Sequence, residues 1–218
     1  KIPKIEARDK TARAIVDAYL TCMRMISMLY KHIPAYVWLI SFSLLISGCV
    51  QRNPDVEDLI GKIIMKVLQQ HPQQAIWHIF PLVNSTSDER KQKYHWIRKQ
   101  TSSLLYKNTN ISLMTFFDET ASLMVQLSTI CSFKAPKDKS STSVEVKLAD
   151  MCQLEHRIPR ELIMPSEQQL SCLQLLDVSQ DPHNPFAFKS VYIRRAHPKV
   201  EILKSLAKPR KLILYGSD

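Results

Sequence analysis

The residues best suited to chemistry lie near the end of the chain, where a short polar loop separates two apolar runs. Ser205 lies in that loop between Lys204 and Lys208, and Arg210 follows it. A strand, a loop with hydroxyl and basic side chains, and a second strand can wrap a phosphate, because backbone N–H groups and a serine donate hydrogen bonds while lysines offset charge. Composition alone favours an exposed basic hairpin without a ligand, so both interpretations stay open on the residue types.

The other patterns that could support chemistry are incomplete. Cys152 and His156 have the spacing of metal ligands on one helix, but no second pair lies nearby and tetrahedral zinc takes four ligands. The sequence contains no G-x-S-x-G or H-E-x-x-H motif and no glycine-rich nucleotide loop of the standard kinds. We therefore expect no catalytic residue and no metal site in these 218 residues.

The net charge of +10 is compatible with a nucleic-acid partner, since lysine and arginine neutralise phosphates. The excess is local, because between Lys189 and Lys211 there are eight basic residues against a single acid, Glu201. A local excess favours a phosphate-facing or solvated surface over a groove for DNA. The alternative function is a non-enzymatic basic α-helical scaffold that binds nucleic acid or an acidic protein partner through this tail.

The elements that position this tail are predicted to be mainly helical. The chain has 45% hydrophobic and 23% charged residues, as globular domains do, and only three glycines, too few for an all-β domain. Apolar residues recur at helical spacing, and Asn53-Pro54 marks a helix start. The pattern predicts six helices in an antiparallel bundle, over residues 9–31, 35–50, 54–68, 72–81, 87–106 and 109–133.

One apolar stretch invites comparison with a membrane span. Residues 35–50 form an almost unbroken apolar run, but they contain serines and a glycine and fall short of the roughly 20 residues that a bilayer requires. A helix buried on all sides is the better interpretation. The five cysteines are scattered and form no C-x-x-C pair, which predicts free thiols in a reducing compartment.

A polar stretch divides the chain into a helical part and a part with short β-like runs. The predicted organisation is a helical region over 1–133, a polar linker over 134–143, a helix and irregular connector over 144–188 with the helix at 144–157, and first strands over 189–218. The β-like runs are 190–194, 200–203 and 212–215. Because a lone hairpin is marginal in water and the chain starts without methionine, we expect a fragment of a longer protein.

Two short motifs resemble a known family. Residues 71–77, HPQQAIW, resemble the (Y/H)-P-Q-Q-A-(hydrophobic)-W element late in the helical FAT region of the phosphatidylinositol-3-kinase-related kinases, with the ATR branch as the nearest match. Residues 208–218, KPRKLILYGSD, resemble an element near the start of the kinase domain in the same family. Segments at 34–39 and 158–165 are similar to less specific family elements and follow the family's order.

The resemblance implies a role for the tail. In these kinases the turn before the second motif serves as the phosphate-binding loop in place of a glycine-rich one. Lys204, Ser205 and Leu206 are thereby expected to approach the phosphates of ATP, and Leu203 the adenine side of the cleft. ATP with Mg²⁺ is the cofactor implied for the parent kinase. The family's ATP-anchoring lysine and its D-R-H-x-x-N and D-F-(D/G) loops are expected beyond Asp218, so this chain alone is expected neither to bind ATP tightly nor to phosphorylate a substrate.

The parent implied by the resemblance is an ATR-like serine/threonine protein kinase of the DNA-damage and replication-stress checkpoint, acting in the nucleus. The implied fold is the C-terminal part of a helical FAT bundle, which braces the kinase domain as a scaffold, followed by the β-rich start of the kinase N-lobe. Implied partners are the remaining FAT region and kinase domain, checkpoint activator or regulatory subunit proteins, and protein substrates. DNA contact is expected to be indirect, and no membrane contact is expected.

Overall fold

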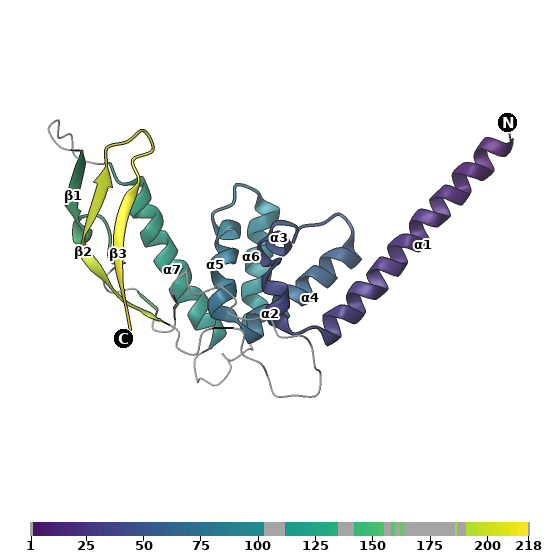
Figure 1. Ribbon diagram of the computed structural model, residues 1–218, viewed down its shortest axis with the longest axis horizontal. Coiled ribbons are helices and arrows are strands. Elements are labelled where there is room, and N and C mark those ends of the chain that lie inside the picture. The colour runs from purple at the N-terminus through teal and green to yellow at the C-terminus, as the bar shows by residue number, and fades with distance from the viewer. Residues whose placement is uncertain are drawn as a thin grey trace.

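The molecule consists of a projecting helix, a helical bundle and a small sheet. The computed structural model describes residues 2–102, 112–134, 142–154, 158–159, 162–163, 186 and 191–217, with side chains described from residue 10 onward. Figure 1 shows the long N-terminal helix on one side of the bundle and the sheet on the other. The predicted mainly helical fold followed by a short β-rich part is confirmed.

The helices of the bundle pack against both their nearest and their next-nearest neighbours in sequence. α1 (Ile2–His32) is the projecting helix and contacts α4 (Pro54–Gln70). α4 packs against α5 (Pro72–Val83) and α6 (Asp88–Thr101), and α7 (Leu113–Ser132) packs against both α5 and α6. In Figure 1, α7 lies between the rest of the bundle and the sheet, so it is the helix that joins the two parts.

The start of α4 follows the local sequence closely. The Asn53 side chain accepts hydrogen bonds from the backbone N–H groups of Asp55 at 3.0 Å and Val56 at 3.4 Å. These bonds satisfy two of the donors that a helix N-terminus leaves unpaired, and Pro54 at the first helical position loses no bond by lacking an N–H. The predicted helix start is therefore confirmed.

The apolar run at 35–50 differs from its prediction. It forms two short helices, α2 (Ala35–Leu39) and α3 (Phe42–Ser47), and not one helix buried on all sides. Phe42 and Ile46 are buried, whereas Ile40 and Leu44 are 60% and 73% exposed. The bundle covers only one side of this segment, so the chain breaks between the helices and directs part of the run inward. Among the helices of the described residues, none is long and apolar enough to cross a membrane.

The later helix ends also differ in detail from the predicted ones. α5 continues past Pro81 to Val83, because a proline near the end of a helix removes only one backbone bond. α6 ends at Thr101, and the predicted continuation to 106 lies partly outside the described residues, since 103–111 are not described. α7 matches the last predicted helix, beginning at Leu113.

The core of the molecule lies where α4, α5, α6 and α7 meet. Apolar side chains from all four helices are almost fully buried there and form one contiguous cluster, which extends to the inner face of the sheet. The largest fully buried side chains of the four helices are Ile63, Ile64, Leu68, Ile76, Ile79, Leu82, Ile97, Leu113 and Phe117. The helical period of the sequence therefore identified the packed face correctly for these helices.

The sheet has three antiparallel strands in the order β1-β2-β3. They are β1 (Ser143–Lys147), β2 (Ile193–Leu203) and β3 (Arg210–Gly216), and β1 is followed by a short 3-10 helix at Leu148–Asp150. The helix predicted over 144–157 is therefore wrong. Val144 and Val146 alternate with charged residues at a period of two, which suits a strand with one buried face, and β2 supplies the pairing edge. Ser143 of the predicted linker belongs to this strand, and residues 135–141 lie outside the described part of the chain.

The central strand β2 unites two of the short runs that the sequence predicted separately. Ala196 pairs with Leu214 and Val200 pairs with Leu212, so three residues of β2 lie opposite one residue of β3. Pro198 is in the middle of these three, at a bulge where its missing N–H removes no regular ladder bond to β3. The bulge explains how a proline is tolerated in a central strand.

Candidate functional site

The candidate site is the loop between β2 and β3, residues 204–209. Leu203 N–H donates to the Pro209 carbonyl at 3.0 Å, which closes the hairpin, and Lys208 N–H donates to the Ser205 carbonyl at 3.0 Å, which closes a tight turn within it. Lys208 has φ of 46°, the left-handed region that residues with a Cβ rarely adopt. The loop is thus a folded turn with defined backbone bonds.

The loop presents backbone donors that the rest of the described chain does not use. The N–H groups of Ser205, Leu206 and Ala207 donate to no other described residue, and neither does the Ser205 hydroxyl. The Lys204 N–H differs, because it donates to the Thr142 carbonyl at 2.9 Å and so extends the β1–β2 ladder. Successive unpaired N–H groups in a turn are the kind of arrangement that binds an anion.

The four residues predicted to contact a nucleotide lie together at this end of the hairpin. Leu203 ends β2 and is 39% exposed, and Lys204 and Ser205 follow it in the loop. Leu206 forms the tip of the turn and is fully exposed, without an apolar partner among the described residues. The structure therefore brings the predicted residues into one small exposed loop, next to the basic residue Lys208.

Most other basic residues of the tail are engaged within the sheet. Lys199 contacts Glu145 at 2.8 Å, and this hydrogen bond lowers the pKa of the Glu145 carboxyl. Lys211 lies 3.7 Å from Glu201. Arg195 stacks over the Tyr215 ring, with its guanidinium carbon 4.2 Å from the ring centroid, and the Arg194 guanidinium lies 5.4 Å from the centroid of the Tyr192 ring. Most basic side chains in the described part of the tail thus pair with a carboxylate or an aromatic ring of the sheet. Within that part they do not form a continuous cationic groove.

Arg210, noted in the sequence only as a basic residue after the loop, makes contacts that the sequence did not reveal. It begins β3, and its Nη2 donates to the Phe133 carbonyl at the end of α7 at 2.9 Å, while its Nη1 donates to the Lys208 carbonyl. The contact with Phe133 spans 77 positions of sequence. No local pattern reports such a contact, because it depends on how α7 meets the sheet.

The first family motif lies at a second junction between the bundle and the sheet. The Trp77 indole N–H donates to the Ile163 carbonyl at 3.2 Å, and Ile163 forms an isolated bridge with Tyr192 just before β2. The His71 ring lies edge-on to Phe186, with centroids 5.2 Å apart. The motif therefore ties α5 to the chain that enters the sheet, a role that its tryptophan did not reveal in sequence.

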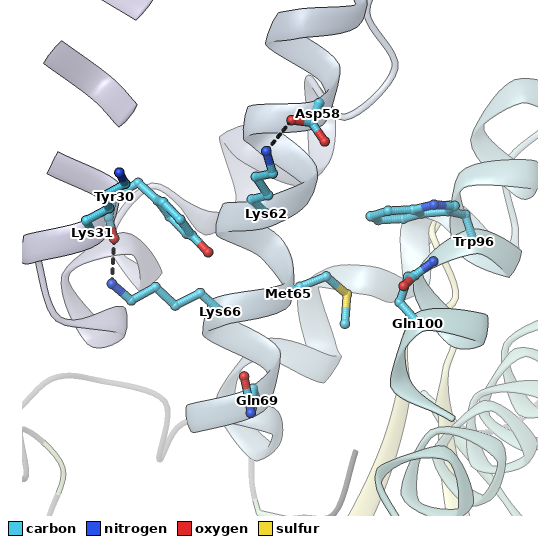
Figure 2. A pocket seen from close by; sticks show the side chains of 9 residues that line it. All are labelled: Tyr30, Lys31, Asp58, Lys62, Met65, Lys66, Gln69, Trp96 and Gln100. Atoms are coloured by element: carbon cyan, nitrogen blue, oxygen red, sulfur yellow. Dashed lines mark hydrogen bonds and ion pairs between the residues drawn. The ribbon is translucent and has the colours of Figure 1, made fainter. Parts of the chain in front are cut away.

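A groove of about 490 Å³ lies between α1, α4 and α6, as Figure 2 shows. Lys66 donates to the Tyr30 and Ile33 carbonyls at 2.6 and 2.7 Å and so caps the end of α1, and burial lowers the pKa of Lys66. Lys62 pairs with Asp58 at 2.6 Å along the same helix. Lys66 thus joins α4 to the end of α1, and Lys62 forms an ion pair within α4. Both lysines therefore have structural partners in the groove.

The wall of this groove is built by Trp96 against Gly61. A Cβ at Gly61 would lie 3.0 Å from the Trp96 ring, so the glycine leaves room for the indole to rest on α4. Lys93 lies 4.5 Å from the centre of the Trp96 ring and pairs with Glu57 at 2.9 Å, although Lys93 is only 8% exposed. Paired in this way, the buried cation joins α6 to α4.

No group of three potential metal ligands occurs among the described residues. Cys152 is half-buried at the end of the turn after β1, and its sequence partner His156 lies outside the described part of the chain. The predicted absence of a metal site stays a prediction.

Comparisons with known proteins agree with the two motifs. Residues 21–123 match a family model described as serine/threonine-protein kinase ATR-like, HEAT repeats. The protein kinase rad3 of Schizosaccharomyces pombe is 26% identical over 188 residues, covering 85% of this chain and 8% of the relative. The serine/threonine-protein kinase ATR of Arabidopsis thaliana is 27% identical over 214 residues, covering 94% of this chain and 8% of the relative.

A solved structure described as the FAT and kinase domain of CtTel1 has the same fold. Its TM-score is 0.62 at 12% sequence identity, and the match covers 89% of this chain and 13% of that one. These matches support the resemblance of this chain to the ATR branch of the phosphatidylinositol-3-kinase-related kinases. The chain spans 8% of the length of each of the two relatives given above.

Proposed function

We propose that this chain joins the helical scaffold of an ATR-like serine/threonine protein kinase to the first strands of its N-lobe, and that the β2–β3 loop binds the phosphates of ATP. The parent would act in the DNA-damage and replication-stress checkpoint, in the nucleus. The observation that carries the proposal is the turn at 204–209, with three adjacent backbone N–H groups that no described residue uses. The kinase names of the relatives support it.

The residues of the loop fit a nucleotide triphosphate. The N–H groups of Ser205, Leu206 and Ala207 and the Ser205 hydroxyl are donors, and Lys204 and Lys208 supply positive charge beside them. ATP with Mg²⁺ would supply the transferable phosphoryl group. The loop's own part is to hold the phosphates in place, and Leu203, exposed at the end of β2, would flank the adenine.

The domain organisation follows from this proposal, with one change from the sequence prediction. Residues 1–133 would form the scaffold and 134–142 the linker, since Ser143 begins β1. The β-rich part would include β1 as well as 189–218, because β1 pairs along β2 from Ser143↔Leu203 to Lys147↔Lys199. The proposed partners are the remaining helical region and kinase domain, activator or regulatory subunit proteins, and protein substrates. The chain by itself would be inactive.

A proline substitution tests the backbone donors directly. Leu206 is the second residue of the turn closed by Ser205 and Lys208, a position where proline is favoured in common turns, so Leu206→Pro removes one N–H while the turn persists. A hydrogen bond to a charged group contributes about 1.5–3 kcal/mol, so KM for ATP in the full-length parent kinase should rise about tenfold or more.

The matched control is Leu206→Ala, which keeps the N–H and removes the exposed side chain. It should change KM for ATP by less than about twofold, since an exposed leucine contributes little. Equal KM values in the proline variant, the alanine variant and the parent would refute phosphate binding by this loop.

A further inference from the structure

The guanidinium of Arg210 is held by backbone carbonyls alone. Its Nη2 donates to the Phe133 carbonyl at 2.9 Å and its Nη1 to the Lys208 carbonyl, while its Nε is buried without a hydrogen-bond partner. No carboxylate of the described residues pairs with it. The side chain therefore bridges two segments, the end of α7 and the turn of the candidate loop, and serves no ion pair of the sheet.

The α7 end of this bridge is electrostatically suited to a cation. Phe133 is the C-cap residue of a helix of 20 residues, and it packs against the core. The last carbonyl groups of a helix have no intrahelical partner and carry the negative end of the helix dipole. Arg210 satisfies one such carbonyl with a charged donor, so a shift of α7 would move the partner of Arg210.

The loop end of the bridge holds the turn. Lys208 is the one described residue other than glycine with a positive φ, and its N–H closes the turn onto Ser205. Its carbonyl is the group that Arg210 binds. The two bonds of Lys208 thus fix both sides of an unfavourable backbone conformation, and that conformation sets where the N–H groups of Ser205 to Ala207 lie.

We propose that Arg210 is a positioning residue that couples the end of α7 to the phosphate-binding conformation of the β2–β3 loop. The inference rests on the proposed function of the loop and adds a route by which the helical scaffold controls nucleotide affinity. Arg210 need not touch the nucleotide. Because coupling between sites is reciprocal, a nucleotide on the loop also stabilises the last turn of α7.

The first test compares Arg210 variants in the full-length parent kinase without nucleotide. Arg210→Gln removes the charged bridge, and hydrogen exchange at the Lys208 amide, which is protected by the bond to Ser205, should accelerate about tenfold. Arg210→Lys keeps one charged donor but cannot span both carbonyls, so its effect should be intermediate. Lys211→Gln is the matched control, because Lys211 is exposed and pairs with Glu201, and it should leave the Lys208 amide unchanged.

The second test separates this inference from the proposed function. Arg210→Gln should raise KM for ATP about tenfold with kcat changed less than about twofold, and binding of a non-hydrolysable ATP analogue should protect the Phe133 amide only when Arg210 is present. Unchanged exchange at Lys208 in Arg210→Gln overturns the positioning role, even if Leu206→Pro still raises KM. Faster exchange at Lys208 with KM unchanged leaves the positioning role and overturns ATP binding by the loop.

Discussion

The helical bundle and the sheet are stabilised in different ways. In the bundle, apolar side chains from four helices are buried against one another, and the polar group Lys93 enters the interior only as a paired cation. In the sheet, one face is buried and the other carries exposed ion pairs such as Lys199–Glu145. Burial of apolar area supplies most folding free energy, whereas exposed ion pairs contribute little.

The difference implies that the sheet depends on the bundle and not the reverse. A sheet of three strands needs a packed face to be stable, and this face is covered by the cluster that continues from the bundle. Trp77 and Arg210 fasten the two parts at separate points. The proposed phosphate loop therefore belongs to the part that depends on the bundle, and Arg210 connects it to the end of α7.

The largest effect is expected from a cavity in the bundle. Phe117→Ala removes a side chain that is 1% exposed, and it should lower the free energy of unfolding by about 4 kcal/mol. Urea unfolding followed by tryptophan fluorescence measures this, because Trp38, Trp77 and Trp96 all lie in bundle helices. The β2 amides should lose protection at the same urea concentration. The control Val125→Ala, at a position 57% exposed on the same helix, should change stability by less than about 0.5 kcal/mol.

A cavity in the sheet should have a smaller and more local effect. Val200→Ala removes about two methylene equivalents from a fully buried site of β2, and it should destabilise the sheet by about 2 kcal/mol. Hydrogen exchange of β2 and β3 should accelerate while the tryptophan-detected transition moves little. A matched change on the outer face, Ile213→Ala, should have less effect since that side chain is 43% exposed. An equal loss in the tryptophan signal for Val200→Ala would show that the two parts unfold as one unit.

The bundle should respond to mild acid through His78. Burial lowers the pKa of His78 below its ordinary value of 6.5, and its ring lies edge-on to Phe42 at 5.8 Å. The unfolded chain then takes up a proton before the folded chain does. Stability is fully present above pH 6.5 and falls as pH drops toward the lower folded pKa, with a slope of at most about 1.4 kcal/mol per pH unit. His78→Gln should flatten this part of the profile of unfolding free energy against pH.

The smallest effect is expected in the sheet at stronger acid. The Lys199 hydrogen bond lowers the pKa of Glu145 below its ordinary value of 4.5, so the stabilisation is present above that value and is lost as pH falls through the folded pKa. Both side chains are exposed, so the change should be slight and screened by salt. Exchange of the β1 amides between pH 5 and 3, compared with Glu145→Gln, checks it. A steep loss in that variant would contradict the assignment.

Local signals predicted the helices well because they act over a few residues. The Asn53 cap and the apolar period of α4 and α7 need no distant partner to be recognised. The segment at 144–147 was mistaken for a helix because its strand forms through pairing with β2, some fifty positions later in the chain. Strand formation depends on such a partner more than on intrinsic preference.

Local signals also located part of the candidate site, the loop between β2 and β3. The loop residues from Leu203 to Leu206 are consecutive, so a motif could indicate them. Arg210 and Trp77 act through backbone carbonyls of Phe133 and Ile163, which any residue type could offer. Since the recognised group carries no side-chain signature, only the tertiary structure reveals these contacts.

The length of α1 gives the molecule a mechanical property. A helix of 31 residues at a rise of about 1.5 Å per residue is roughly 46 Å long, and its base is fixed to α4 by the bonds of Lys66 to Tyr30 and Ile33. With that base as fulcrum, a tilt of about 10° would sweep the far tip through about 8 Å. A force applied at the N-terminal end of α1 would correspondingly rotate the helix by a small angle about its base, and the force on the contacts of Lys66 would be larger than the applied force.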